Sequence, residues 1–284
     1  MVMKLQFLGT GAAEGVPAMY CQCETCKEVR KRGENEFHTR SQYLLDEKIG
    51  IDFPPDAYYH SLRFGVDLRE IEFLLITHSH MDHFYAHDFI LRGYKYASPL
   101  QKPLHIFGNA EVCKVFQECT RRELREEVAE RIVMREVYPF QPFSFGEGYT
   151  AIPLLAQHSK NEQAFVYLIK TGNTSYLHLT DTGRLPEETW VYLKEYFKEN
   201  TPLDFITFDC TFLFRTAGEV SRHMGLEDNK VTEKRLLEIG GINKKTRFAI
   251  THYSHNNAPL SERLKESEER YGYLAAYDGM TVEF

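Results

Sequence analysis

The chain alternates between short, continuous apolar runs and longer mixed segments in which apolar residues have helical spacing. Ile71–Thr77 reads IEFLLIT, which predicts a central strand that is buried on both faces. The other predicted strands are Lys4–Leu8, Gln42–Leu45, Lys48–Phe53, Leu104–Phe107, Ile132–Tyr138, Tyr149–Ala156, Ala164–Lys170, Ser175–Leu179, Asp204–Asp209 and Arg247–Thr251, with a final strand pair within Tyr273–Phe284. The predicted helices are Pro54–Phe64, Asp88–Ala97, Asn109–Arg122, Pro186–Lys198, Asn229–Ile239 and Leu260–Tyr271.

The order of these elements predicts the fold class. Strands come early as hairpins and later alternate with helices, in two similar halves. No linker rich in proline, glycine or serine divides the halves. We therefore expect a single α/β domain over residues 1–284, with a mixed sheet in each half.

Composition and charge narrow the function classes. With 284 residues, 43% of them hydrophobic and 26% charged, the chain is an ordinary globular protein. Its net charge of -7 argues against binding to long nucleic acid, but bound divalent cations would still let it accept a small anionic substrate. The N-terminal sequence MVMKLQFLG is too short and polar for a signal peptide, and no run of 18 apolar residues exists. We expect a cytoplasmic protein without a membrane partner.

One six-residue segment carries four potential metal ligands. His78–His83 reads HSHMDH and follows directly on the apolar run Ile71–Thr77. Loops after strand ends are where α/β sheets place functional residues. Imidazole and carboxylate groups suit divalent metals such as zinc, manganese, iron or nickel. The segment therefore predicts a metal centre at the end of this strand.

The same segment has the His-x-His-x-Asp-His hallmark of the metallo-β-lactamase superfamily, which the chain resembles. In that superfamily the remaining ligands each follow a later strand. His158, Asp181 and His252 match this rule, because each comes directly after a predicted strand. The resemblance implies an αβ/βα four-layer sandwich, in which two mixed β-sheets are flanked by helices.

The resemblance also implies how the ligands divide between two divalent metal ions. One metal binds His78, His80 and His158, the other binds Asp82, His83 and His252, and Asp181 bridges the two. A bridging hydroxide, formed from water between the cations, would then be the nucleophile. Zinc or manganese fits this ligand set, with nickel and iron as alternatives. Asp52 and Thr77 are candidates for orienting the ligand histidines.

Three cysteines, Cys21, Cys23 and Cys26, are clustered on what we expect to be a long loop. Without a secretory signal, this clustering indicates a metal site rather than a disulfide framework. Three thiolates are one ligand short of a closed tetrahedral zinc site, and His255 is the candidate for the fourth. Such a structural zinc would clamp the N-terminal loop to the last strand. Reduced, buried thiols without metal are the alternative.

A narrower resemblance rests on the combination of motifs. The Gly-Thr-Gly turn, the sequence GVPA at Gly15–Ala18 and the cysteine pattern are similar to the phosphoribosyl cyclic phosphate phosphodiesterase family of the carbon–phosphorus lyase pathway. Members of that family hydrolyse cyclic phosphodiesters, and the resemblance places an additional histidine, His223, near the scissile phosphate. His223 would protonate the leaving oxygen or hydrogen-bond a phosphoryl oxygen, and a surface loop histidine is the alternative. The resemblance makes His223, Asp82 and Asp181 the catalytic residues.

Two segments depart from that family. Phe212–Phe214 reads FLF and would shape a more apolar pocket or a dimer contact. Gly93–Glu136 is long and would form a lid or cover. Within it, the mixed-charge run Arg121–Arg131 predicts a solvated helix face.

The expected function is the hydrolysis of a small phosphodiester, cyclic ones included. Three other functions stay open: a cytosolic ester, lactone or thioester hydrolase, a nuclease of the tRNA-processing type, and a non-enzymatic metalloprotein that assists cofactor biosynthesis. The acidic charge and the lack of a basic arm argue against the nuclease. Ligands at all seven positions argue against the non-enzymatic protein. A homodimer is compatible with the sequence.

Overall fold

The computed structural model describes residues 2–98 and 102–284, whose strands form two seven-stranded sheets. The first sheet contains, in spatial order, β14 (Thr281–Glu283), β1 (Lys4–Gly9), β2 (Gln42–Leu45), β3 (Ile49–Ile51), β4 (Phe73–Leu75), β5 (Leu104–Gly108) and β6 (Ile132–Glu136). The second contains β13 (Leu274–Ala275), β12 (Arg247–Thr251), β11 (Phe205–Asp209), β10 (Thr174–Leu179), β9 (Phe165–Thr171), β8 (Tyr149–Leu155) and β7 (Phe143–Phe145). Both sheets are mixed, since antiparallel hairpins continue into parallel strands.

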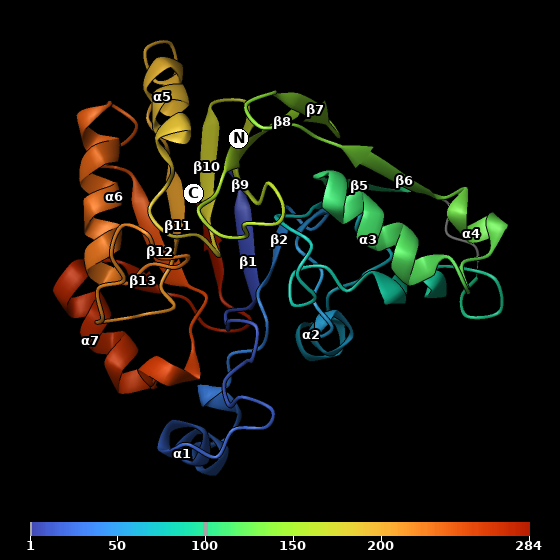
Figure 1. Ribbon diagram of the computed structural model, residues 1–284, viewed down its shortest axis with the longest axis horizontal. Helices are drawn as coiled ribbons and strands as arrows, with labels where there is room; N and C mark the ends of the chain where they lie inside the picture. Colours follow the sequence, from blue (N-terminus) through green and yellow to red (C-terminus); the bar gives the residue numbers. More distant parts are fainter. Residues whose placement is uncertain (1, 99–101) are drawn as a thin grey trace.

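The helices are α1 (Glu24–Arg32), α2 (Ala57–Phe64), α3 (Ala110–Thr120), α4 (Glu126–Ala129), α5 (Glu187–Tyr196), α6 (Leu226–Glu238) and α7 (Ser261–Tyr271). Most of them cover the outer faces of the two sheets, whereas α1 lies apart from both sheets, below them in Figure 1. In Figure 1, α5, α6 and α7 lie outside the second sheet, whereas α2 and α3 lie on the side of the first. This arrangement confirms the predicted four-layer sandwich. No helix in the described part of the chain is both long and apolar enough to cross a membrane.

Apolar side chains fill the spaces between the four layers. Strand β9 illustrates how: Phe165, Tyr167 and Ile169 belong to the core between the sheets, and Val166 and Leu168 to the core under the outer helices. Because both faces of such a strand are buried, its sequence is apolar throughout. The two sheets therefore share one central core, and each has a second core under its own helices.

The cysteine segment is not the long loop that we expected. Helix α1 begins directly after Cys23 and contains Cys26, so two of the three thiols lie at its start. Its only buried side chains are those of Cys26 and Val29, and the rest of its surface is polar. A helix with so narrow an apolar stripe gives little periodic signal, which explains why it was missed.

The expected helix Asp88–Ala97 is also wrong. The segment forms a 3₁₀ helix, η2 (Ala86–Leu91), and the backbone then turns at Tyr94, which has a φ of 56°. A non-glycine residue in this left-handed region cannot continue a right-handed helix.

The C-terminal strands do not pair with each other as we expected. Strand β13 adds to β12 at the edge of the second sheet, whereas β14 pairs with β1 at the edge of the first. The chain end thus ties the two sheets together. Strand β7, which pairs with β8, was not predicted.

The segment Gly93–Glu136 is not a lid over the functional pocket described below. Its residues 99–101 lie outside the described part, and the rest supplies β5, α3, α4 and β6 to the first sheet and its helical cover. The run Arg121–Arg131 is not one helix face, since α3 ends at Thr120 and only the short α4 is helical within it.

Candidate metal centre

The candidate ligands come together because the strands before them end at the same edge of the sandwich. His78 follows β4, His158 follows β8, and Asp181 and His252 follow β10 and β12. Strands β10, β11 and β12 run parallel and side by side, so the residues at their carboxyl ends are neighbours. This topology places Asp209, the last residue of β11, between Asp181 and His252 in the order of the strands.

One group of side chains consists of His78, His80, His158 and Asp181, whose ligand atoms all lie within 4.8 Å of one another. The Nε2 atom of His78 is 3.2 Å from Oδ2 of Asp181. The Nδ1 atom of His158 is 3.1 Å from the other carboxylate oxygen of Asp181. This group contains the first of the two ligand sets that the resemblance implied, together with Asp181.

A second group shares Asp181 and adds Asp82, His83 and His252. The Nε2 atom of His83 lies 3.0 Å from Asp181 Oδ2 and 3.2 Å from Asp82 Oδ2. All four side chains are buried. The structure thus brings together all seven ligand residues of the prediction in two groups that meet at Asp181.

The polar atoms of these groups fit divalent cations. Within the described residues, His83 Nε2, His252 Nε2 and Asp181 Oδ1 are buried and make no hydrogen bond, although each lies 3.0 to 3.9 Å from another side chain of the cluster. A buried polar atom without a partner costs free energy, so three of them converging on one place need an explanation. Cations bound among imidazoles and carboxylates would supply the missing partners.

Side chains behind the ligands fix their orientation. Asp52 Oδ2 accepts a hydrogen bond from His83 Nδ1 at 2.6 Å, which leaves His83 Nε2 for the cluster. Thr77 donates to Asp52 from both its backbone N–H and its hydroxyl, and the hydroxyl also contacts His78 Nδ1 at 3.0 Å. Asp52 and Thr77 therefore take the positions expected of residues that orient metal ligands.

Burial and neighbouring carboxylates act in opposite directions on the ligand histidines. Burial lowers the pKa of His78 to about 3 and so favours the neutral ring that a metal requires. Burial also opposes the charged form of His83, but the carboxylates of Asp82 and Asp52 outweigh it and raise the pKa of His83 well above its usual value. A cation at Nε2 would compete with the proton there.

The backbone turns sharply just after strands β3, β10 and β12. Asp52, Asp181 and His252 have φ angles of 62°, 55° and 64°, in the left-handed region that few non-glycine residues adopt. Such conformations cost free energy and persist only where the surrounding structure holds them. They are concentrated at functional sites. A related constraint acts at Gly183, where a Cβ atom would lie only 1.9 Å from the carbonyl oxygen of Ser221. Glycine there lets the loop that carries His223 approach Asp181.

His223 lies beside the metal groups, between Asp181, which was predicted, and Asp209, which was not. Its Nδ1 is 3.0 Å from Asp209 Oδ2 and 3.1 Å from Asp181 Oδ1. Asp209 is in turn fixed by the backbone N–H groups of Thr211 and Met224. Burial disfavours the charged ring, but the two carboxylates outweigh it and raise the pKa of His223 to about 11. Cations bound to Asp181 would reduce this shift, because they take up its negative charge.

A cavity of about 620 Å³ opens onto the metal groups and His223. Its walls are formed by Ala12, Ala13, Glu14, Thr211, Phe212, Arg215, Ser254, Asn256 and Asn257. Of the expected apolar segment, Phe212 does line the cavity, whereas Leu213 is in the core and Phe214 lies under the guanidinium groups of Arg263 and Arg270. The cavity has the size of small-molecule sites.

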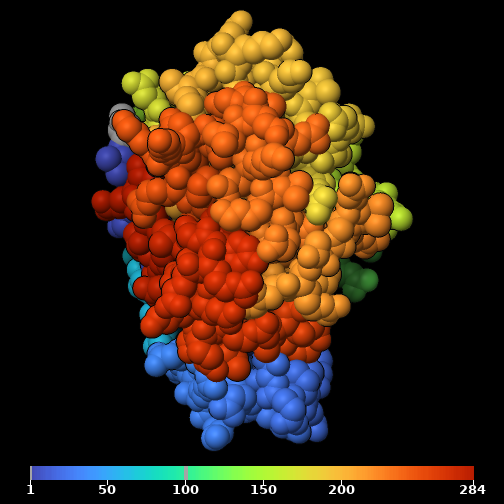
Figure 2. Space-filling view, turned by 90° about the vertical axis from the view of Figure 1, so that its left-hand side faces the viewer, coloured from blue at the N-terminus to red at the C-terminus, as the bar shows by residue number. Residues whose placement is uncertain are grey.

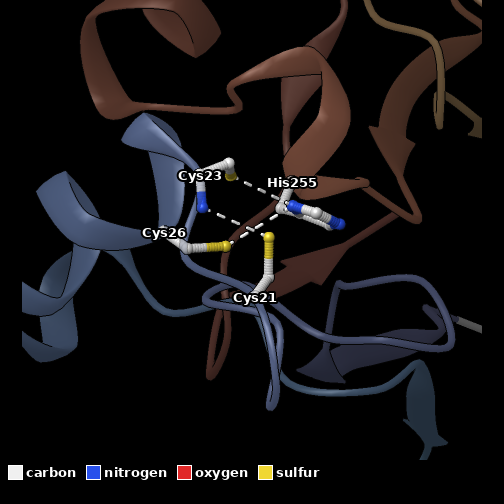
Figure 3. Close-up of side chains that lie close together, drawn as sticks. All are labelled: Cys21, Cys23, Cys26 and His255. Carbon is white, nitrogen blue, oxygen red and sulfur yellow. Dashed lines mark hydrogen bonds between the residues drawn. The ribbon is translucent and has the colours of Figure 1, made fainter.

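The cysteine residues form a separate group with His255 (Figure 3). The Sγ atoms of Cys23 and Cys26 each lie 3.4 Å from His255 Nδ1, and Cys21 Sγ accepts from the backbone N–H of Cys23. The N–H of Cys26 at the start of α1 stabilises the thiolate of Cys23 and lowers its pKa to about 6. Three sulfur atoms and one imidazole within 4.8 Å fit a tetrahedral zinc ion.

The group of Cys21, Cys23, Cys26 and His255 joins the N-terminal and C-terminal parts of the chain. His255 begins the 3₁₀ helix η3 (His255–Asn257), which follows β12, and the cysteines lie on α1 and the loop before it. Figure 2 shows the N-terminal segment, in blue, directly beneath the C-terminal segment, in red. Arg32 at the end of α1 reinforces the contact through two hydrogen bonds to Glu262 of α7, at 2.7 and 3.0 Å.

Comparison with known proteins agrees with this architecture. The family model described as "Beta-lactamase superfamily domain" matches residues 51–253. A diphosphatase from the PhnP family has a similar structure, with a TM-score of 0.71 and 22% identity over 100% of this chain and 98% of that one. Zinc-bound PqqB from Methylobacterium extorquens has a TM-score of 0.72 and 16% identity over 98% and 99% of the two chains. At these identities the similarity shows the fold.

A curated relative matches over a shorter stretch. An octanoyltransferase of Porphyromonas gingivalis (strain ATCC BAA-308 / W83) is 33% identical over 85 residues, which cover 28% of this chain. The match spans only 16% of that protein's length.

Proposed function

Because this chain belongs to the metallo-β-lactamase superfamily and is a metal-dependent hydrolase, we propose that its substrate is a small phosphodiester, cyclic ones included. The observation that carries the proposal is the placement of His223 against Asp209 and Asp181, beside two groups of metal ligands and on a cavity of about 620 Å³. An anionic phosphodiester would gain from a site with positive charge on several sides. A neutral ester would gain less.

We assign the ligands as the resemblance implies. His78, His80 and His158 would hold one divalent metal, Asp82, His83 and His252 would hold the other, and Asp181 would contribute to both. Zinc or manganese suits these nitrogen and oxygen ligands. When bound, two such cations supply Lewis-acid polarisation of the phosphoryl group and lower the pKa of a nearby water molecule.

His223 acts on the leaving group in this proposal. The Asp209 carboxylate, 3.0 Å away, keeps a proton on Nδ1 and favours the doubly protonated ring. The second N–H, on Nε2, is then available to the oxygen that departs from phosphorus. An alkoxide is a poor leaving group, so donation of this proton lowers the barrier to bond cleavage. Asp82 and Asp181 contribute as ligands, because their negative charges would keep the cations beside the reacting phosphoryl group.

A substrate panel tests the proposal directly. The protein is loaded with manganese, zinc or nickel and assayed with bis(p-nitrophenyl) phosphate, 2′,3′-cyclic AMP, p-nitrophenyl acetate and nitrocefin. We include p-nitrophenyl octanoate as well, because the curated relative is an octanoyltransferase. We expect kcat/KM for the phosphodiesters to exceed that for the carboxyl esters and the lactam. Faster hydrolysis of an acyl ester or of nitrocefin would refute the phosphodiester assignment.

A further inference from the structure

A second cavity, of about 740 Å³, lies away from the metal groups. It is lined by residues of β4 and β5 in the first sheet and by residues of α2 and η2, which cover that sheet. Among the described residues, this cavity and the one at the metal groups have no lining residue in common. Tyr58 and Leu91 in its wall are 66% and 45% exposed, so the cavity opens to solvent. Its volume suits a small molecule, and the proposed hydrolysis does not use it.

The inner wall of this second cavity is apolar. The lining side chains that belong to the core under the helices of the first sheet are Phe53, Ile71, Leu74, Phe89 and Leu104. An apolar group that enters the cavity removes its own surface and this wall from water, which is favourable. The polar groups of a sugar or a nucleobase would find few partners along such a wall, whereas an alkyl chain needs none. The wall therefore selects an apolar ligand.

One arginine in the wall of the second cavity is without a partner. Within residues 2–98 and 102–284, the guanidinium group of Arg92 makes no hydrogen bond or ion pair, although its side chain is only partly exposed. Burial lowers the pKa of Arg92, and no neighbouring carboxylate offsets this effect. The other arginine at the cavity, Arg69, is 74% exposed and binds Asp67, with Nε 2.8 Å from Oδ1. Withdrawing an arginine charge from water is costly unless an anion pairs with it, so Arg92 is suited to an anionic ligand.

Asp88 limits how much negative charge the ligand can carry. It lines the same cavity but forms no ion pair with Arg92 among the described residues. A phosphate monoester carries nearly two negative charges at pH 7, and the Asp88 carboxylate would repel the second. A carboxylate carries one charge and matches the guanidinium group in a bidentate geometry. We propose that this cavity binds an apolar monocarboxylate of the fatty-acid type, with its carboxylate on Arg92 and its alkyl chain along the apolar wall.

Three ligands with the same alkyl chain and different head groups test this site. Isothermal titration calorimetry of the manganese-loaded protein compares decanoate, 1-decanol and decyl phosphate, each below the concentration at which it aggregates. We expect decanoate to bind about tenfold more tightly than either of the others, because only it gains a charge-assisted hydrogen bond without repulsion. Equal affinity for 1-decanol, tighter binding of decyl phosphate or no binding of decanoate would overturn the proposal. Displacement of decanoate by inorganic phosphate would place it at the metal centre and would also overturn the proposal.

Two substitutions with opposite expected effects locate the binding site. Arg92→Gln should weaken decanoate binding about tenfold and leave the affinity for 1-decanol unchanged. Asp88→Asn removes a like charge and should strengthen decanoate binding about threefold, a gain that a misfolded variant could not produce. Arg63→Gln is the matched control, because Arg63 is paired with Glu34 on α2 and does not line the cavity, so wild-type affinity is expected. Wild-type affinity in Arg92→Gln, or a loss in Arg63→Gln as large as that in Arg92→Gln, would refute the assignment.

Discussion

The two candidate metal sites differ in their ligands, in the elements that carry them and in their access to a cavity. The histidine and aspartate centre lies on loops after buried strands of both sheets and borders a cavity of about 620 Å³. The cysteine group lies on α1 and η3, at the junction of the chain's two ends. A site with open positions suits chemistry, whereas a closed tetrahedral site suits structure.

The two candidate metal sites also differ in backbone conformation. Asp52, Asp181 and His252 hold left-handed φ angles at strand ends, where two packed sheets can support such conformations. The cysteine ligands need no such turn, because Cys23 precedes α1 in extended backbone and Cys26 is helical. The first site therefore depends on the finished sandwich, whereas a zinc ion at the second would tie α1 to η3.

The largest effect should come from Asp181, which both metal groups share. Asp181→Asn removes the shared negative charge, so we expect metal content at the histidine and aspartate centre to fall and activity to drop by at least about a thousandfold. The cysteine group should keep its zinc. Metal analysis and steady-state kinetics on bis(p-nitrophenyl) phosphate measure both. Unchanged metal content with unchanged turnover would refute the shared-ligand assignment.

The next effect concerns His223 and depends on the leaving group. His223→Ala should reduce kcat for a substrate with an alkoxide leaving group by about 10²–10⁴-fold, the usual contribution of a general acid. The loss for bis(p-nitrophenyl) phosphate should be much smaller, because p-nitrophenolate departs without a proton. Comparison of the two substrates in the variant and wild type is the measurement. Equal losses would instead assign His223 to phosphate binding.

A pair of substitutions three residues apart should separate the two sites. His255→Ala should release the tightly held zinc and lower the melting temperature by roughly 10 °C, if a lost clamp costs a few kcal/mol as a lost disulfide does. His252→Ala should abolish activity and leave that zinc in place. Metal analysis with thermal melts of both variants checks this. A His255 variant that retains the zinc and the wild-type melting temperature would contradict the clamp.

The smallest effect should come from Arg32, which ties α1 to α7 beside the cysteine group. Arg32→Gln removes two hydrogen bonds to Glu262 and one each to Glu28 and Glu36, but the Arg32 and Glu262 side chains are partly exposed, at 33% and 56%. Exposed ion pairs contribute about 0–1 kcal/mol, so the melting temperature should fall by no more than about 4 °C. The zinc should stay bound, since the cysteines and His255 hold it. Zinc loss in this variant would show that the ion pair, rather than the ligands, maintains the clamp.

The sequence predicted those parts of the molecule in which chemistry is dense along the chain. His78–His83 carries four potential ligands in six residues, and Cys21–Cys26 carries three thiols, so each segment identifies its own candidate site. The fold followed from the apolar runs of the buried strands. Helix α1 was missed because its buried face consists of two residues.

Other parts depend on contacts between segments that the sequence does not join. Asp209 looks like any carboxylate at a strand end, and only the parallel pairing of β11 with its neighbours brings it to His223. Glu14 is likewise ordinary in sequence, and a hydrogen bond from Ser254, 240 residues away, holds it on the cavity wall. Strands β13 and β14 also join different sheets, and only the finished sheets determine which edge each strand joins.

Stepwise removal of metal tests the contrast between the two sites most directly. A thiolate site without an open position should resist a competing ligand, whereas a site that admits substrate should not. Mild chelation followed by metal analysis and assay should therefore abolish activity first and leave about one zinc per chain. Adding manganese or zinc should then restore activity. If activity persists after all but one metal ion is removed, or if the last zinc leaves together with the others, the account of one open catalytic centre and one closed structural site is contradicted.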